Sequence, residues 1–328
     1  LFDVAEHLPG SYPFLAALTN VVLRALRQAY AAYVASANDL ADYAGVRLAR
    51  QALAEVEEHS HMLGAALADL DGVPEDRAEA ARWQARLQAL LAAAGGIDGT
   101  APRRAMARGD VLAPYSIPHT LRRDDSLPRV WDFVAPPLDQ APEHLDYMLA
   151  LRLSEINVAE GLAIVLFETE GMPWAFSLDI SRHLWDEMRH SLFGEAAIEA
   201  TYGRRDAIPM RDYEGEFAME APPLEQYAVL GLEVEGKNMK YPPGKRQEWE
   251  FARDTARHPL ATTFQDFDWA DEVLHVNIAR RQLETWFPGG LKQIGEFARQ
   301  GKEHRSEVKH RQAPTAIPHP PEAPGTSG

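Results

Sequence analysis

Apolar residues recur at three- and four-residue spacing along most of the 328-residue chain, which is the period of an amphipathic α-helix. Alternating β-branched runs are scarce, and no stretch of the sequence predicts a convincing strand. The pattern predicts helices over about residues 12–37, 43–70, 75–94, 143–169, 174–202, 223–240, 260–287 and 291–311, with a short helical insertion at 245–257. We therefore expect an all-α protein.

Breaks in this periodicity divide the chain. Gly95-Gly96 ends the third predicted helix, and the chain that follows is rich in Pro, Arg, Asp and Gly. We expect helices packed on a bundle in residues 1–95, a Pro-rich connecting loop in 96–142, the bundle and a C-terminal helix in 143–311, and a disordered tail in 312–328. Long loops inside compact domains are often functional, so residues 113–123 are a candidate cover for a pocket.

Composition narrows the classes of partner and cofactor. A net charge of −16 disfavours nucleic acid and anionic membrane surfaces, because both need accumulated Lys and Arg. No apolar run approaches the roughly 18 residues that span a bilayer. No targeting segment is evident, so we expect a cytoplasmic protein with small-molecule or protein partners. Because the chain has no cysteine, any metal must be held by histidine and carboxylate ligands.

An internal repeat relates two pairs of predicted helices. A shift of 85 residues aligns residues 186–203 with 271–288 and superimposes two Asp-Glu-x-x-His motifs. A shift of 75 residues aligns the preceding helices and pairs Glu160 with Glu235. Each copy therefore carries one glutamate on its first helix and Asp-Glu-x-x-His on its second.

The spacing within each motif suits a metal ion. Glu and His three residues apart lie about 60° apart around a helix and about one turn along it, so both side chains can reach one ion. Two facing helices of this kind, with a Glu from each of two others, surround two metals with four carboxylates and two imidazoles. Iron and manganese both accept such ligands. Asp186 and Asp271, which begin the motifs, can each orient a ligand histidine through its outer ring nitrogen.

Residues 143–287 resemble the ferritin-like non-haem diiron superfamily, and the motif at 186–190 resembles the D-E-x-R-H signature of bacterial multicomponent monooxygenases and ribonucleotide reductase relatives. The resemblance implies a ferritin-like four-helix bundle with additional N-terminal helices and a C-terminal helix. It implies the metal ligands Glu160, Glu187, His190, Glu235, Glu272 and His275. It also implies two iron ions, with Mn/Fe and Mn/Mn pairs as alternatives, and dioxygen as co-substrate. The sequence departs from the family at Leu274, where the second motif lacks the Arg, and at Phe167, where a Tyr is common.

The two single glutamates each have a rival. Both Glu155 and Glu160 are flanked by apolar residues, but the repeat favours Glu160 because the residue that matches Glu155 is Leu230. Glu233 is the rival of Glu235, but its helix face is more polar. The choice between the members of each pair stays open at this point.

Two further pairs of residues have candidate roles. His183 and its repeat counterpart Asp268 each lie four residues before a motif glutamate, so they are candidate extra ligands or hydrogen-bonding groups just outside the ligands. Glu58 and His61 form a third Glu-x-x-His pair, but the preceding predicted helix has no acidic residue. That absence favours an ordinary solvated polar face for Glu58 and His61.

The expected function is a dioxygen-dependent dimetal oxygenase or oxidase that acts on a small organic substrate by hydroxylation, desaturation, N-oxygenation or oxidative cleavage. The alternatives are a ferroxidase or iron-handling protein, a dimanganese catalase-type enzyme, a hydrolytic dimetal site and a scaffold with a vestigial site. The chain has no G-x-G-x-x-G motif and no cysteine, so an external reductase or ferredoxin is the expected electron donor. Many proteins of the resembled superfamily are dimers, so a homodimer is an open alternative to a monomer.

Overall fold

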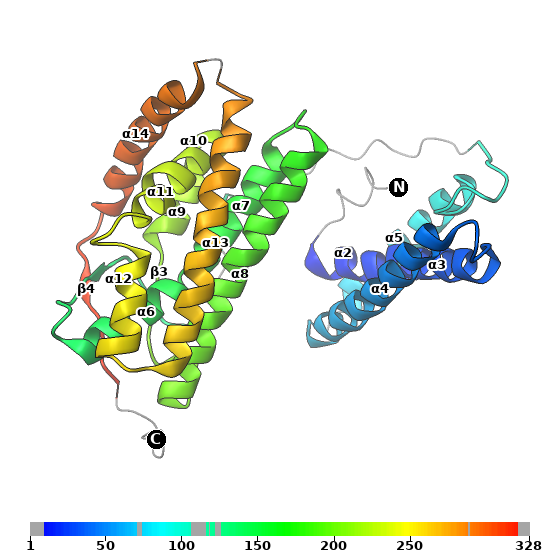
Figure 1. Cartoon of the computed structure of the whole chain (residues 1–328). Coiled ribbons are helices and arrows are strands. Elements are labelled where there is room, and N and C mark those ends of the chain that lie inside the picture. Colours follow the sequence, from blue (N-terminus) through cyan, green and yellow to red (C-terminus); the bar gives the residue numbers. More distant parts are fainter. Residues whose placement is uncertain are drawn as a thin grey trace. The chain divides into compact units, whose positions relative to one another are not determined.

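The chain forms two compact units, residues 1–117 and residues 118–328. The structure is a computed structural model, shown in Figure 1, and it describes residues 10–70, 74–105, 116–117, 119–121, 126–287 and 289–320. These residues are mostly helical, as the periodicity predicts. Most of the segment 113–123 lies outside the described residues, so its expected role as a pocket cover stays a prediction.

The first unit consists of helices that match the first three predicted ranges. Its elements are α2 Ser11–Ala17, the π-helical segment η1 Leu18–Leu23, α3 Arg24–Ser36, α4 Tyr43–Asp69 and α5 Pro74–Ala93. The first three form one continuous helix, which packs through α2 on α5 and through α3 on α4. Ala17, Val21, Trp83 and Leu87 make the small core of this unit.

The second unit is a helical bundle built around the long helix α8. Its helical elements are α6 Ala141–Leu153, α7 Ile156–Glu168, α8 Trp174–Tyr202, α9 Tyr213–Glu220, α10 Pro223–Ala228, η2 Val229–Val234, α11 Glu235–Asn238, α12 Lys245–Glu250, η3 Phe251–Thr255, α13 Pro259–Glu284 and α14 Gly290–Lys309. Helix α8 packs against α6, α7 and α13, and α13 also packs against α10, η2, α11 and α12. Figure 1 shows α8 and α13 side by side along the length of this unit.

The predicted helix at 143–169 is broken into α6 and α7 at Ser154 and Glu155. The break lies where α8 comes closest: a Cβ atom on Gly194 would stand 2.2 Å from the backbone nitrogen of Leu153. The Ser191 hydroxyl of α8 donates to the Leu153 carbonyl at 2.9 Å, so a carbonyl at the end of α6 keeps a partner. Tertiary packing therefore overrides a sequence that reads as one helix.

A second interruption lies in the predicted helix at 223–240. The segment η2 is π-helical and ends directly before Glu235. An extra residue in a helical turn changes the direction in which the following side chains point, and such bulges are frequent at functional sites. Both helices that precede the two motif helices are thus irregular at a glutamate.

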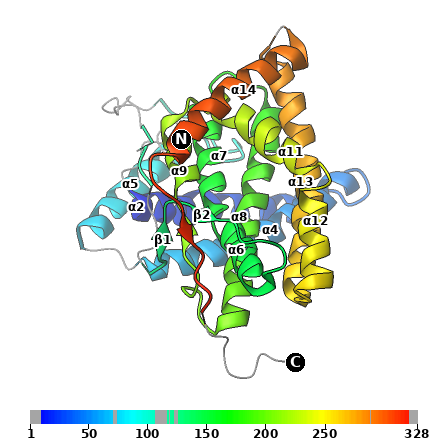
Figure 2. The same cartoon turned by 90° about the vertical axis from the view of Figure 1, so that its left-hand side faces the viewer.

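Two pairs of short parallel strands occur in the described part of the second unit, where the sequence predicts none. β1 Arg129–Val130 pairs with β3 Met210–Arg211, and β2 Phe133–Val134 pairs with β4 Thr315–Ala316. The β4 strand lies in the segment predicted to be disordered, and Figure 2 shows the chain after α14 running beside β2. The prediction is wrong for this part because Thr315 donates its amide to the Asp132 carbonyl and Ile317 is buried. Residues 321–328 lie outside the described residues.

The core of the second unit contains a polar layer between apolar clusters. On α8, Phe176 and Ile180 belong to one cluster, and Ala197 and Ile198 belong to another. Between them, residues 183–191 carry a series of buried polar side chains, and α13 repeats this pattern. In the part of the chain that the structure describes, no helix is both long and apolar enough to cross a membrane.

Candidate metal centre

The polar layer is formed mainly by the two repeated motifs. Helix α8 contributes His183, Asp186, Glu187 and His190, and α13 contributes Asp268, Asp271, Glu272 and His275, all of them buried. The spacing of three, four and seven residues places each set on one face of its helix. Burying ionised carboxylates without partners costs several kcal/mol per group, so this layer needs compensating cations or hydrogen bonds.

One half of the layer, the His275 group, consists of His183, Glu187, Glu235 and His275. One candidate ligand atom from each residue lies within 4.8 Å of the others. His275 Nδ1 lies 3.2 Å from Glu187 Oε1, and His183 Nε2 lies 2.8 Å from Glu235 Oε1. Among the described residues, neither carboxylate has a lysine or arginine as an ion-pair partner.

The other half, the His190 group, consists of Glu155, His190 and Asp268. His190 Nδ1 lies 3.5 Å from Asp268 Oδ1 and 3.6 Å from Glu155 Oε2. The same nitrogen lies 3.8 Å from Glu187 Oε1, which also belongs to the His275 group. Glu187 therefore lies between the two groups, where a bridging ligand of two metals would stand.

Two buried cations contact the His190 group. Arg152 Nη1 lies 3.0 Å from Glu155 Oε1 and also pairs with Asp268. Lys245 Nζ lies 2.8 Å from Asp268 Oδ2 and 2.9 Å from Glu272 Oε1. The carboxylates of this half are thus already paired with protein cations.

The aspartates that begin the motifs bind the outer nitrogens of the histidines. His190 Nε2 and Asp271 Oδ2 are 3.0 Å apart, and His275 Nε2 and Asp186 Oδ2 are 3.4 Å apart, so each aspartate serves the histidine of the opposite helix. Arg189 donates to both aspartates and ties the two helices together. A histidine whose outer nitrogen donates to a carboxylate keeps a fixed orientation and presents its other nitrogen to the centre.

The inner atoms of the layer lack partners. Buried side-chain atoms without a hydrogen-bond partner in the described structure include Glu155 Oε2, Glu187 Oε1, Glu235 Oε2, Glu272 Oε2, and Nδ1 of His183, His190 and His275. Native proteins seldom leave buried polar atoms unpaired, and each such atom calls for an explanation such as an ion. Carboxylate oxygens and imidazole nitrogens in this combination suit iron or manganese, so the residues present fit a metal centre.

The pKa shifts of the buried glutamates show that the layer disfavours some of its ionised carboxylates. Burial raises the pKa of Glu155 to about 8 against the opposing effect of Arg152, and burial likewise raises that of Glu272 to about 7. Burial works in the same direction on Glu187, but the close approach of His183 and the two motif histidines holds its pKa well below the ordinary value. Metal cations would remove the repulsion that disfavours ionised Glu155 and Glu272.

The structure brings together most of the predicted ligands, with one exchange. Glu187, His190, Glu235 and His275 belong to the two groups, and Glu272 is buried in the same layer, where it pairs with Lys245. Glu160 is half-buried on α7 and belongs to neither group, whereas Glu155 belongs to the His190 group. The break at Ser154 and Glu155 explains the exchange, because it turns the first glutamate toward α8 and α13.

Other candidates also find definite places. The rival Glu233 pairs with Lys237 and Lys302, so the structure favours Glu235. His183 and Asp268, expected as extra ligands or neighbours of ligands, each belong to a candidate ligand group. In the first unit, Glu58 and His61 are exposed on α4 and belong to neither group. This is the arrangement expected of an ordinary solvated polar face.

Sequence reasoning missed the two cations. Arg152 lies three residues before Glu155, a spacing that suggests an ion pair on a helix. Lys245 follows the sequence Pro242-Pro243-Gly244 and carries no local signal, because its partners are on α13.

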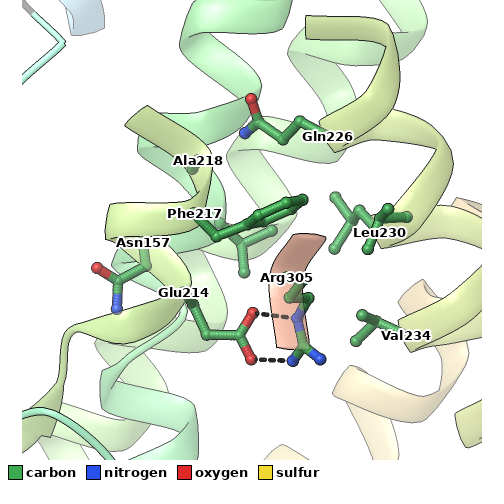
Figure 3. A pocket seen from close by; sticks show the side chains of 10 residues that line it. Asn157, Glu214, Phe217, Ala218, Gln226, Leu230, Val234 and Arg305 are labelled. Carbon is green, nitrogen blue, oxygen red and sulfur yellow. Dashed lines mark hydrogen bonds and ion pairs between the residues drawn. The ribbon is translucent and has the colours of Figure 1, made fainter. Parts of the chain in front are cut away.

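A cavity of about 280 Å³ adjoins the layer. Glu155, Glu187, Glu235, Glu272 and Lys245 line it on one side, and Tyr147, Arg211, Tyr213 and Arg305 also contribute to its wall. A smaller apolar pocket, drawn in Figure 3, shares Leu230, Val234 and the Glu214–Arg305 ion pair with this cavity. The layer is therefore reached from a space with both charged and apolar walls.

No protein-family model, curated protein or solved structure matches this chain. The chemistry of the polar layer and its cavity is therefore the basis for any function assigned to this chain.

Proposed function

We propose that the second unit is a ferritin-like dimetal bundle and that the protein is a dioxygen-activating oxidoreductase acting on a small organic substrate. The observation that carries the proposal is the set of unpartnered carboxylate and imidazole atoms, which face one another in two adjoining groups. Two redox-active ions, iron or manganese, would supply the binding and reduction of dioxygen at this position.

The residues of the chain have separate tasks in this proposal. Glu187 would bridge the two ions, and His190 and His275 would each bind one of them through Nδ1. Asp271 and Asp186 hold these rings in place from the outside. Burial of the layer excludes bulk water, which protects an oxidising centre from side reactions.

The cavity supports an organic substrate over iron storage. Its volume of about 280 Å³ suits a small molecule, and the carboxylates of the layer form part of its wall. Tyr147, Tyr213 and Arg211 offer polar contacts that would orient such a molecule. Hydroxylation, desaturation, N-oxygenation and oxidative cleavage all fit this arrangement, with an external reductase or ferredoxin as electron donor.

The test is metal content together with dioxygen consumption. Metal-free protein would be loaded anaerobically with Fe(II), analysed by mass spectrometry for iron, and exposed to dioxygen in an oxygen-electrode cell. We expect up to two ions per chain and rapid dioxygen uptake, with both reduced in Glu187→Gln and His275→Ala.

The matched control is Glu160→Gln, which removes a carboxylate of α7 that is a member of neither candidate ligand group. We expect this variant to bind metal as the unaltered chain does, whereas Glu155→Gln loses affinity. A chain that binds no metal above background and consumes no dioxygen would refute the proposed function.

A further inference from the structure

A lysine ammonium group lies inside the proposed metal centre. Lys245 is only 1 % exposed, and its Nζ contacts both oxygens of Asp268, at 2.8 and 2.9 Å, and Glu272 Oε1 at 2.9 Å. It is the first residue of α12 and follows Gly244, whose φ of 138° and close approach to two carbonyl oxygens leave no room for a side chain. From this position the Lys245 side chain reaches Asp268 and Glu272 on α13.

Formal charge divides the layer unequally. The His275 group holds two carboxylates, Glu187 and Glu235, and one divalent cation would neutralise them. The His190 group holds two carboxylates, Glu155 and Asp268, and Glu272 shares Lys245 with Asp268. Two protein cations, Arg152 and Lys245, already pair with these three carboxylates. An ion entering that side meets one net negative charge in place of three.

We infer that the two metal positions are unequal: the His275 group binds one divalent ion tightly, and a second ion binds at the His190 group only by displacing Lys245 from Asp268 and Glu272. Removing or adding one charge at about 4 Å from an ion, at the effective dielectric constant of a protein, changes affinity by at least about 100-fold. The second ion should therefore bind about 100-fold more weakly than the first.

The cavity provides space for an alternative position of the Lys245 side chain. Lys245 lines the 280 Å³ space beside the layer, together with Glu248 and Asn238, so its flexible stem can turn toward these polar groups. The inference depends on the proposed dimetal centre and adds an order of assembly to it. When metal is scarce, each chain would hold one ion. Two different metals could then bind one after the other.

The test is a titration of the metal-free full-length chain with Mn(II), with free Mn(II) measured by its electron paramagnetic resonance signal. In the unaltered chain we expect one tight ion and a second that binds about 100-fold more weakly. In Lys245→Met and Lys245→Gln, which remove one positive charge, the affinity for the second ion should rise by at least about 100-fold. The control Lys292→Met, at an exposed position on α14, should behave as the unaltered chain.

Two histidine variants assign the positions. His275→Ala should lose the tight ion, whereas His190→Ala should keep it and lose only the weak one. Circular dichroism of each variant verifies that its helical content is unchanged, and the comparison of the two ions in the unaltered chain needs no variant at all.

Two equally tight ions in the unaltered chain would overturn the inference and leave the proposed dimetal function standing. The inference also fails if the second affinity is the same, within about twofold, with and without the Lys245 ammonium. Absence of any bound ion would instead refute the proposed function itself.

Discussion

Replacing Gly194 with alanine tests how α8 shapes the centre. The added Cβ would stand 2.2 Å from the backbone nitrogen of Leu153 and 2.8 Å from the carbonyl carbon of Arg152. Restoring a distance of 3.4 Å, where ordinary contacts begin, requires α6 to move by about 1.2 Å. Because the obstructing atoms are backbone, no side-chain rotation can relieve the clash.

The magnitude follows from two opposing effects. Alanine is favoured over glycine inside a helix by about 1 kcal/mol, whereas overpacking of a core costs about 1–3 kcal/mol and more where backbone must shift. We expect Gly194→Ala to lower the free energy of unfolding by about 2–3 kcal/mol. The matched control is Gly295→Ala on α14, where nothing lies within 4 Å of the added Cβ, and this variant should gain up to about 1 kcal/mol.

The assay is urea unfolding of the metal-free chain followed by circular dichroism, combined with the Mn(II) titration. Movement of the α6 end also displaces Glu155, so the weaker ion should be lost before the tight one. Equal unfolding free energies for Gly194→Ala and Gly295→Ala, within about 0.5 kcal/mol, would refute the close approach as the cause of the α6–α7 break.

Three further predictions concern charge, hydrogen bonding and the tail. Burial raises the pKa of Glu214, but two neighbouring arginines lower it to about 2, so its stabilising effect is present above pH 4.5 and is lost as the pH falls toward 2. The stability difference between the unaltered chain and Glu214→Gln, measured by urea unfolding, should therefore shrink as the pH falls from 5 to 3, and a constant difference would contradict this. Asp271→Asn should weaken Mn(II) binding about 10- to 100-fold because His190 loses its outer partner, and unchanged affinity would exclude that role. Deleting residues 312–328 exposes the site of Ile317 and removes the β2–β4 pairing, so the thermal unfolding midpoint should fall; an unchanged midpoint would count against the pairing.

The helices could be read from the sequence because their cause is local. Apolar residues at three- and four-residue spacing predict α8 and α13 to within a few residues, since an amphipathic helix needs one buried face. The break between α6 and α7 could not be read in this way. It depends on the close approach of Gly194 and on a hydrogen bond from Ser191, both of which belong to another helix.

The residues of the candidate centre likewise fall into those predicted by local sequence and those decided by packing. Residues Glu187, His190, Glu272 and His275 follow from the sequence, because three-residue spacing on a helix places a carboxylate and an imidazole on one face. Packing between separate helices decides that Glu155 and not Glu160 joins the centre. It also decides that Lys245 lies between Asp268 and Glu272. Periodicity along one helix determines which side chains share a face, whereas the partner that each buried charge meets is decided by the packing of neighbouring helices.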